Sequence, residues 1–519
     1  MRKLACLLLV AAGALAAAKD FTLTVLHTND LHGHVEPTVI RGKPFGGYAR
    51  HLTLIEKFRK QDPNVMLVNA GDVFQGTLFF TQYEGLADLI YMNAARYDAF
   101  TLGNHEFDKG PNVLARFLER TTFPTVSANM DFSDEPSLAK KVKPWAIVKI
   151  NGESIGVVGA MTPDLTTLVS ALPNIALKEL IPSVQSAIDE LTNQKVNKVL
   201  VLSHCGYEMD QEMAKKLRGA DLVVGGHSHT PLGEVKLPGD LASRGEYPTK
   251  LKSASGEPAM VVQAWEWGKV FGRIQVTFDD NGLIKAVPSA TPIVVDETIP
   301  EDPVFKATVD ALLMPIQVLR KTKVTEAAGP FTRVESRTGE SLLGNLVADA
   351  MLAKTAPQGA MVALMNPGGL RADIEPGVIS VETCLNVQPF GNTLVVLDLN
   401  LGELKATLEN PRAYFLQVSK GFQVGYDLSR PEGDRVTSIR LNGSTLWPIP
   451  PNVRIGNIRI VTNSFLAGGG DGADALKAAK GTRIDTGYVD VEALMDYLRT
   501  QPAWKLAPEN RIAVTGKLP

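Results

Sequence analysis

Strand-like runs alternate with helical stretches through the first half of the chain, and this alternation restricts the fold more than any other feature. The runs FTLTVLHTND, VMLVNAGD, FTLGN, VLVLSH and LVVGGH end at residues 30, 72, 104, 204 and 227. Amphipathic helical stretches lie between them, at residues 50–60, 86–96, 184–193 and 211–217. This alternation predicts an α/β layer architecture, in which ligands collect where strands end and loops begin.

The chain is too long for one hydrophobic core. Single cores stop growing at roughly 250 to 300 residues, so 519 residues with 45% apolar content predict two domains. The pattern changes near residue 295, where Pro300 and Asp302-Pro303 introduce a helical stretch at 304–320 with one apolar face. We interpret this stretch as a linker helix.

The second half has a mixed pattern of its own. Helices are expected at 342–354 and 402–409, and strands at 361–364, 393–398, 421–426, 435–441 and 458–461. It is therefore a second globular α/β domain. The predicted division is a leader at 1–18, a first domain at 19–298, a linker helix and hinge at 299–322, and a second domain at 323–519.

The N-terminus is typical of a cleaved secretory leader. Arg2 and Lys3 precede an apolar run at 4–15 and a small-residue exit at 16–18. The apolar run is shorter than the roughly 20 residues that a membrane-spanning helix needs. We expect a secreted or periplasmic protein without an integral membrane segment after the leader is removed.

Charge and cysteine content narrow the partners and the redox chemistry. A net charge of −3 offers no basic surface for nucleic acid, which favours a small-molecule partner. Cys205 and Cys384 are the cysteines beyond the leader. The sequence leaves their pairing open, and two buried free thiols is the interpretation that we favour. The oligomeric state is not predicted.

All eight histidines lie between His27 and His229, and many of them follow the predicted strands. Taken singly, an aspartate there could cap a turn and a histidine could be structural. Taken together, carboxylate, amide and imidazole donors at several strand ends suit two divalent ions such as Zn²⁺ or Mn²⁺, with a carboxylate between them. The donors are Asp30, His32, Asp72, Asn104, His105, His204, His227 and His229.

At these residues the chain resembles the calcineurin-like metallophosphoesterases, and among them the secreted 5′-nucleotidase family, which includes UDP-sugar hydrolases. The matching words are TNDLHGH, NAGDVFQG, TLGNHEFD, VLSHCGYE and VVGGHSHT. In the second half they are RTGESLLGNLVADAM, NPGGLR, QPFGNT and NSFLAGGGDG. The resemblance implies an αββα metallophosphoesterase sandwich, a linker helix and a C-terminal mixed α/β domain that binds the substrate.

The resemblance also implies how the donors divide between two metal ions. One ion would be held by Asp30, His32, Asp72 and His229, and the other by Asp72, Asn104, His204 and His227. Zn²⁺ or Mn²⁺ is favoured, with Co²⁺, Mg²⁺ or Ca²⁺ as alternatives. Asp72 and a water would bridge the ions, and this water would attack the phosphorus atom.

Two further residues of the first domain are implied in catalysis. His105, free of metal, would stabilise the transferring phosphoryl group or assist the leaving oxygen, and Asp108 would orient its imidazole. The alternative for Asp108 is a helix cap before Pro111.

The resemblance assigns substrate contacts to the second domain. Phe390 and Phe465 would sandwich the base, Asn392 would bond its edge, and Asp471 would accept hydrogen bonds from ribose hydroxyls. Polar groups of the substrate would meet Arg337, Asn366 and Arg371, with Arg333 as a further candidate. Core phenylalanines and solvated arginines are the alternatives for these residues.

Two positions depart from the family pattern. His229 stands where several well-known members have Gln or Asn, whereas related cyclic-nucleotide phosphodiesterases and other bacterial members commonly have His there. Pro367 replaces the first glycine of the common NGGG word, which leaves the contact of Asn366 open.

The function implied is a dimetal 5′-nucleotidase that acts on nucleoside monophosphates, with di- and triphosphates and UDP-sugars as further candidate substrates. Two alternatives are left open. One is a 2′,3′-cyclic-nucleotide 2′-phosphodiesterase with 3′-nucleotidase activity, and the other is a nucleotide-binding protein with a vestigial metal site.

Overall fold

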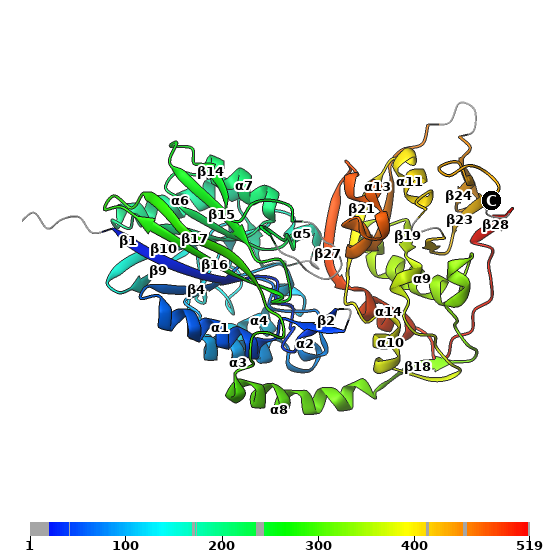
Figure 1. Cartoon of the computed structure of the whole chain (residues 1–519), viewed down its shortest axis with the longest axis horizontal. Coiled ribbons are helices and arrows are strands. Elements are labelled where there is room, and N and C mark those ends of the chain that lie inside the picture. Colours follow the sequence, from blue (N-terminus) through cyan, green and yellow to red (C-terminus); the bar gives the residue numbers. More distant parts are fainter. Residues whose placement is uncertain are drawn as a thin grey trace, which may run out of the picture.

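A computed structural model describes residues 20–40, 42–168, 172, 174–234, 243–411, 415–449 and 454–516. The leader predicted at 1–18 lies outside the described residues. Two groups of sheets lie at opposite ends of an elongated molecule, and the chain passes from one to the other through α8 (Figure 1). No helix in the described ranges is both long enough and apolar enough to cross a membrane.

Two sheets packed face to face form the centre of the first group. The seven-stranded sheet has the order β17 (Ile284–Val294), β16 (Val270–Phe278), β1 (Phe21–Thr28), β4 (Val65–Asn69), β5 (Ala99–Thr101), β6 (Thr125–Val126) and β8 (Val142–Lys143). The six-stranded sheet has the order β14 (Thr249–Lys252), β15 (Pro258–Gln263), β13 (Leu222–Gly225), β12 (Val199–His204), β10 (Glu153–Met161) and β9 (Trp145–Ile150). The central strands of both sheets are parallel, so their carboxyl ends lie at one edge.

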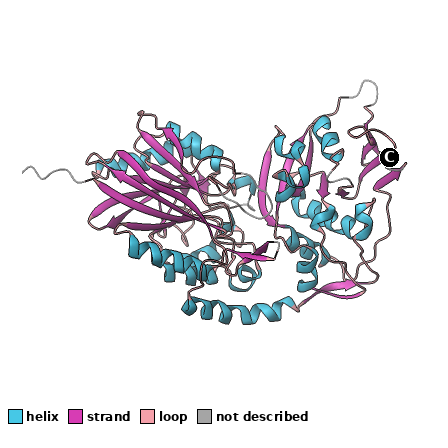
Figure 2. Cartoon of the chain, viewed as in Figure 1, coloured by secondary structure: helices cyan, strands magenta, loops and turns pink. Residues whose placement is uncertain are grey.

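Strand periodicity explains how the sheets share a core. In β1, Leu23 and Val25 pack toward the second sheet, whereas Leu26 packs toward the helices on the outer face. The outer helices of the first sheet are α1 (Tyr48–Gln61), α2 (Leu78–Tyr83), α3 (Leu86–Ala95) and α4 (Pro111–Leu118). Those of the second sheet are α6 (Leu180–Asn193) and α7 (Tyr207–Lys216). The result is the predicted αββα sandwich (Figure 2).

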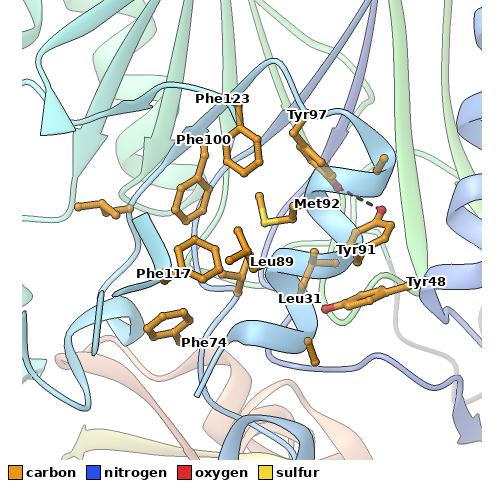
Figure 3. Packing of buried hydrophobic residues seen from close by; sticks show 14 of the residues in the cluster. Leu31, Tyr48, Phe74, Leu89, Tyr91, Met92, Tyr97, Phe100, Phe117 and Phe123 are labelled. Carbon is orange, nitrogen blue, oxygen red and sulfur yellow. Dashed lines mark hydrogen bonds between the residues drawn. The ribbon is translucent and has the colours of Figure 1, made fainter. Parts of the chain in front are cut away.

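The layer between the first sheet and its helices is rich in aromatic rings. Phe74, Phe100 and Phe117 pack in edge and tilted contacts, with centroids 5.2 to 6.0 Å apart, as Figure 3 shows. Tyr91 and Tyr97 share a hydrogen bond between their hydroxyls, so the polar ends of these rings are satisfied inside the core. This packing holds strands β1, β4 and β5 against the outer helices of the first sheet.

The helix α8 (Pro303–Arg320) connects the two groups and lies along the lower edge of the molecule in Figure 1. Asp302 caps it by accepting a hydrogen bond from the backbone N–H of Phe305 at 2.8 Å. Phe305, Val309 and Ile316 are buried against the first group. The helix predicted at 304–320 is therefore confirmed, and it continues through Pro315.

A mixed five-stranded sheet forms the centre of the second group. Its order is β22 (Gln417–Val418), β19 (Val362–Met365), β26 (Ile458–Asn463), β21 (Thr393–Leu399) and β27 (Arg483–Val489). One face packs on α9 (Leu342–Thr355), α10 (Val381–Val387) and α14 (Asp490–Leu498). The other face packs on α11 (Leu401–Leu408) and on the sheet β25 (Ser444–Trp447), β24 (Val436–Leu441), β23 (Phe422–Asp427) and β28 (Ile512–Thr515).

Shorter elements complete the described part of the second group. They are β18 (Lys323–Ala327) paired with β20 (Gly377–Ser380), the helices α12 (Ser464–Ala467) and α13 (Asp474–Ala478), and the 3₁₀ turns η2 (Val334–Arg337) and η5 (Gly470–Gly472). The helices and strands predicted in this half are confirmed to within a few residues. Cys205 and Cys384 are buried free thiols, as expected.

Candidate metal centre and active site

Polar side chains meet at the carboxyl edge of the two packed sheets. Asp30 and His32 follow β1, Asp72 follows β4, and Asn104 follows β5. His204 ends β12, and His227 and His229 follow β13. Parallel pairing places these strand ends side by side, with Thr28 opposite Asn69 and Asn69 opposite Phe100. The polar residues predicted at the ends of separate strands therefore lie along one edge of the packed sheets.

Six of these residues form two groups in which the ligand atoms lie within 4.8 Å of one another. The groups are Asp30, His32 and His229, and Asp72, His204 and His227. Asp72 lies between them, because its Oδ2 is 2.9 Å from His204 Nε2 and 3.8 Å from His32 Nε2. Asp72 Oδ2 is thus within 4 Å of a histidine from each group.

The donors suit divalent ions in chemistry as well as position. His32 Nε2 and His229 Nε2 are 3.2 Å apart, so two imidazole nitrogens converge on one point. Asn104 Oδ1 is buried and has no hydrogen-bond partner among the described residues. A buried acceptor without a donor is costly unless something else binds it, and a cation is the partner that convergent oxygen and imidazole donors take.

Hydrogen bonds at Nδ1 orient two of the imidazoles. His32 Nδ1 is 3.0 Å from the carbonyl oxygen of Phe74, and His204 Nδ1 is 2.7 Å from that of Ala70. Each ring therefore donates at Nδ1 and presents Nε2 to the centre, which is the arrangement expected of metal-binding histidines.

The backbone is strained at several of these residues. Asp30, His32, Asp72, His227 and His229 all have φ between 46° and 74°, in the left-handed region that L-residues avoid. Such strain persists only where packing enforces it, and it concentrates at functional sites. The site is also tightly packed at Gly103, because a Cβ there would lie 2.1 Å from Asp72 Oδ1.

His105 begins the turn η1 (His105–Phe107) beside the two groups. Its Nδ1 is 2.6 Å from Asp108 Oδ2, and its backbone N–H donates to Asp72 Oδ1 at 2.9 Å. Burial disfavours the imidazolium, but Asp108 and Asp72 outweigh burial and raise the pKa of His105 to about 10. Gly110 rather than Asp108 is the N-cap of α4, so the helix-cap alternative for Asp108 does not hold.

Sequence reasoning missed two carboxylates that organise this site. Glu106 is fully buried and accepts hydrogen bonds from the backbone N–H groups of Asp72, Val73, Phe74 and Gly103. Glu266 lies 2.7 Å from His229 Nδ1. Glu106 lies in the motif TLGNHEFD, next to His105, and this position could have marked it as a residue of the site. Nothing in the sequence near Glu266 indicates which histidine it would reach.

The predicted substrate residues form two clusters in the second group. Arg371 lies 5.5 Å from the centre of the Phe390 ring, and Arg333 donates to the carbonyl oxygen of Leu370 at 3.4 Å. Asn366 donates to Asp471 Oδ2 at 2.8 Å, and the ring of Phe465 lies against Gly470.

Asn392 and Arg337 are the other two predicted substrate residues. Asn392 donates to Asp490 at 3.4 Å. The Asn366 side chain also accepts a hydrogen bond from Asn463 at 2.9 Å. Its two hydrogen bonds therefore form although Pro367 begins the next turn. Arg337 ends η2, and its side chain lies outside the described part of the structure.

Strand β27 of the second group covers His105 in this structure. Gly487 in β27 lies so close that a Cβ there would be 1.6 Å from His105 Nε2. Burial raises the pKa of the neighbouring Asp485, while His229 opposes that shift. The loop that contains Gly391, between Phe390 and Asn392, reaches the first group at Trp267, 3.6 Å from where a Cβ on Gly391 would lie.

Comparison with known proteins gives this fold and site a family. Residues 23–231 match the calcineurin-like phosphoesterases, and residues 318–478 match the 5′-nucleotidase C-terminal domain. The 5′-nucleotidase of Diplobatis ommata is 37% identical over 537 residues, covering 98% of this chain and 92% of that protein. The human 5′-nucleotidase is 34% identical, with 97% and 93% covered.

Solved structures agree with these relatives. A 5′-nucleotidase precursor from Thermus thermophilus is 42% identical, with a TM-score of 0.64 and coverage of 95% of this chain and 99% of that one. The NAD nucleotidase of Haemophilus influenzae is 25% identical, with a TM-score of 0.77 and coverage of 96% and 100%. The fold and site thus define a metal-dependent phosphohydrolase with a calcineurin-like first domain. The chain belongs to the 5′-nucleotidase family.

Proposed function

We propose that this chain removes the 5′-phosphate from nucleoside monophosphates, with Asp30, His32, Asp72 and His229 around one divalent ion and Asp72, Asn104, His204 and His227 around the other. The position of Asp72 between the two donor groups carries the proposal most strongly. Two bound ions would supply a nucleophilic water at neutral pH and positive charge for the phosphoryl oxygens. Zn²⁺ or Mn²⁺ suits this mixture of imidazole and oxygen donors.

In this proposal His105 acts on the phosphoryl group or on the leaving oxygen. Asp108 holds its Nδ1, so Nε2 is the nitrogen available to the substrate. The raised pKa keeps the ring protonated near neutral pH, and bound dications would lower that pKa. A cationic imidazole at this point can donate a hydrogen bond to a phosphoryl oxygen or a proton to the departing ribose oxygen.

The second group supplies the base and sugar contacts in this proposal. Phe390 is 40% exposed, and the guanidinium of Arg371 lies over its ring, 5.5 Å from the ring centre. Asp471 offers carboxylate oxygens beside Asn366 and Phe465. The aromatic base of a nucleotide can stack on phenylalanine rings, and its ribose diol can donate to a carboxylate. Its phosphate can pair with guanidinium groups. The second group carries side chains of all three kinds.

Reaction requires the two groups to move relative to each other. Gly487 fills the space beside His105 Nε2 that a phosphoryl oxygen needs. We therefore assign the hinge to residues 299–322, between a metal domain at 19–298 and a substrate domain at 323–519. A crosslink from the Arg371 loop to the first domain is expected to change turnover, and unchanged turnover would count against the hinge.

A second candidate is a 2′,3′-cyclic-nucleotide phosphodiesterase with 3′-nucleotidase activity. The imidazole at position 229 favours it, because His is common there in such enzymes, while the two phenylalanines favour the 5′-nucleotidase. Phosphate release from AMP, 3′-AMP and cyclic 2′,3′-AMP decides between them. Faster release from AMP supports the first candidate, and faster release from either of the others supports the second.

We also assign residues 1–18 to an export signal, which places the mature enzyme in the periplasm or outside the cell. The basic start, the short apolar run and the alanine exit support this assignment. N-terminal sequencing of the exported protein is expected to begin at Lys19. Retention of Met1 in the exported protein would contradict it.

A further inference from the structure

A buried acidic side chain joins the metal centre to a lysine. Glu266 follows β15, and its carboxylate contacts two partners, with Oε2 2.7 Å from His229 Nδ1 and Oε1 2.5 Å from Lys269 Nζ. The side chains of His229, Glu266 and Lys269 are 9%, 12% and 3% exposed. These contacts therefore form largely out of water, where each charge depends on its partner.

The loop that carries Glu266 is held rigidly at the end of β1. Lys269 Nζ lies 3.7 Å from the ring centre of Trp265 and 4.1 Å from that of Trp267. The backbone N–H of Trp267 donates to the carbonyl oxygen of Asp30 at 2.7 Å, and the Asn29 amide donates to that of Trp265 at 2.6 Å. Glu266 thus has a defined position relative to the donors.

His229 differs from the other oriented imidazoles in its partner. His32 and His204 meet neutral backbone carbonyls at Nδ1, whereas His229 meets a carboxylate. A carboxylate 2.7 Å from Nδ1 places a negative charge behind the ring and makes the opposite ring nitrogen a better electron donor. That nitrogen, His229 Nε2, is 3.3 Å from Asp30 Oδ1 and 3.2 Å from His32 Nε2.

We infer that Glu266 is a positioning residue for His229: held by Lys269, it fixes the imidazole with Nε2 toward Asp30 and His32 and sets the affinity of this group for a divalent cation. The inference rests on the proposed role of His229 as a metal ligand. Glu266 pairs with His229 of the Asp30 group, so this group is expected to lose more affinity than the Asp72 group.

Metal titration of the stripped full-length enzyme tests the inference. Mn²⁺ and Co²⁺ are titrated by calorimetry into the wild type, Glu266→Ala and Glu266→Gln, and Co²⁺ absorption reports the ligand field. Loss of an outer carboxylate partner costs about 10- to 100-fold in metal affinity, so Glu266→Ala is expected to weaken one of two sites by that factor. Glu266→Gln is expected to lose less, because the amide keeps the size of the side chain and an oxygen beside Nδ1 while it removes the charge.

Matched variants separate positioning from stability. Glu153→Gln alters another glutamate that pairs with a largely buried lysine, Lys198 at 3.1 Å, far from any donor, and it is expected to leave both affinities unchanged. The melting temperature of each metal-free variant measures stability apart from metal binding. A lowered melting temperature with both affinities unchanged in Glu266→Ala and Glu266→Gln would overturn the inference, and so would an equal loss at both sites.

A third variant distinguishes failure of the inference from failure of the proposed function. His229→Ala is expected to lose one of two ions. If it keeps two ions of wild-type affinity, His229 is not a ligand, and both the assignment of His229 and the inference fall. If it loses one ion while the Glu266 variants bind as the wild type does, only the role of Glu266 is wrong.

Discussion

His105 Nδ1 and Asp108 Oδ2 lie 2.6 Å apart, three residues from each other along the chain, and this contact leaves Nε2 of the imidazole beside Gly487 of the second domain. The turn that carries both residues follows β5 directly, so the sheet and its aromatic core fix their position. The imidazole and its carboxylate are therefore expected to act as one unit.

Replacing His105 with Ala is expected to lower kcat by about 100- to 10,000-fold, the range for loss of a general acid or base. Asp108→Asn is expected to lose less, and the double variant no more than His105→Ala, because Asp108 acts through the imidazole. Steady-state kinetics with AMP, together with metal content, measures this. A double variant with fully additive losses would show that Asp108 acts independently.

Replacing Asp72 with Ala is expected to remove both metal ions and the hydrolytic activity, because this carboxylate lies beside both donor groups. Adenosine binding through the second domain is expected to persist. Elemental analysis and calorimetry measure the two effects. Asp221→Asn, a buried carboxylate that accepts from the backbone of Val199, serves as the control. An Asp72→Ala protein with wild-type activity and no metal would disprove the dimetal site.

Replacing Phe390 with Ala is expected to raise KM for AMP and leave kcat nearly unchanged. Aromatic stacking beyond simple burial contributes about 0.5 to 1.5 kcal/mol, which corresponds to about a 2- to 12-fold change. Val378, an apolar side chain of the same domain that is 60% exposed, provides the control variant Val378→Ala. If KM for AMP is the same in both variants, the base does not stack on Phe390.

Replacing Gly487 with Ala is expected to shift the two domains out of the arrangement described here, because a Cβ would overlap His105 Nε2. Small-angle X-ray scattering of the free enzyme measures this shift. Gly443→Ala is the matched control, because Gly443 also has positive φ but a Cβ placed there would meet no atom within 4 Å. An unchanged scattering profile for Gly487→Ala would mean that the Gly487 contact is easily accommodated.

The contact between Gln75 and Glu492 predicts a pH dependence of domain arrangement. Gln75 Nε2 donates to Glu492 Oε2 at 2.5 Å across the two domains. Burial raises the pKa of Glu492 to about 7, with Lys354 opposing and Asp496 and Asp108 adding to the shift, and Lys109 also opposes it. An acid whose pKa is raised in the docked arrangement binds a proton on docking.

Docking is therefore expected to weaken as the pH rises from the ordinary glutamate pKa of about 4.3 to about 7, and to level off above that range. Glu492→Gln, which cannot titrate, is expected to flatten this dependence. Scattering profiles between about pH 5 and pH 8 compare the two proteins across this range. An identical pH response in both would show that other groups control the arrangement.

Much of the fold and of the metal centre was predictable because both depend on local patterns. Period-two and period-3.6 hydrophobicity located the strands and helices, and strands rich in Val and Leu marked the buried sheets. Asp30, Asp72 and His204 stood out only as members of a set, because five polar strand ends together are hard to explain as turns. Leu26 and Val25 show the same principle in the core, since adjacent residues of one strand pack on opposite faces.

Other parts of the site had no local signal. Glu266 reaches His229 only because β13 and β15 are neighbours in the sheet, although β14 lies between them in the sequence. Gly487 meets His105 from the other end of the chain. Contacts of this kind depend on how strands pair and how domains dock, and single-residue patterns do not encode either.

The sequence by itself determined the element order, the two-domain division of the pattern and the set of candidate metal donors, because each of these follows from residue types at short spacing. Tertiary structure decided which donors lie together, which carbonyl or carboxylate lies at Nδ1 of each oriented imidazole, and what covers His105. The physical reason is that metal binding and hydrogen bonding act over a few ångströms. Only packing of the strands and docking of the domains brings residues from distant parts of the chain within that distance.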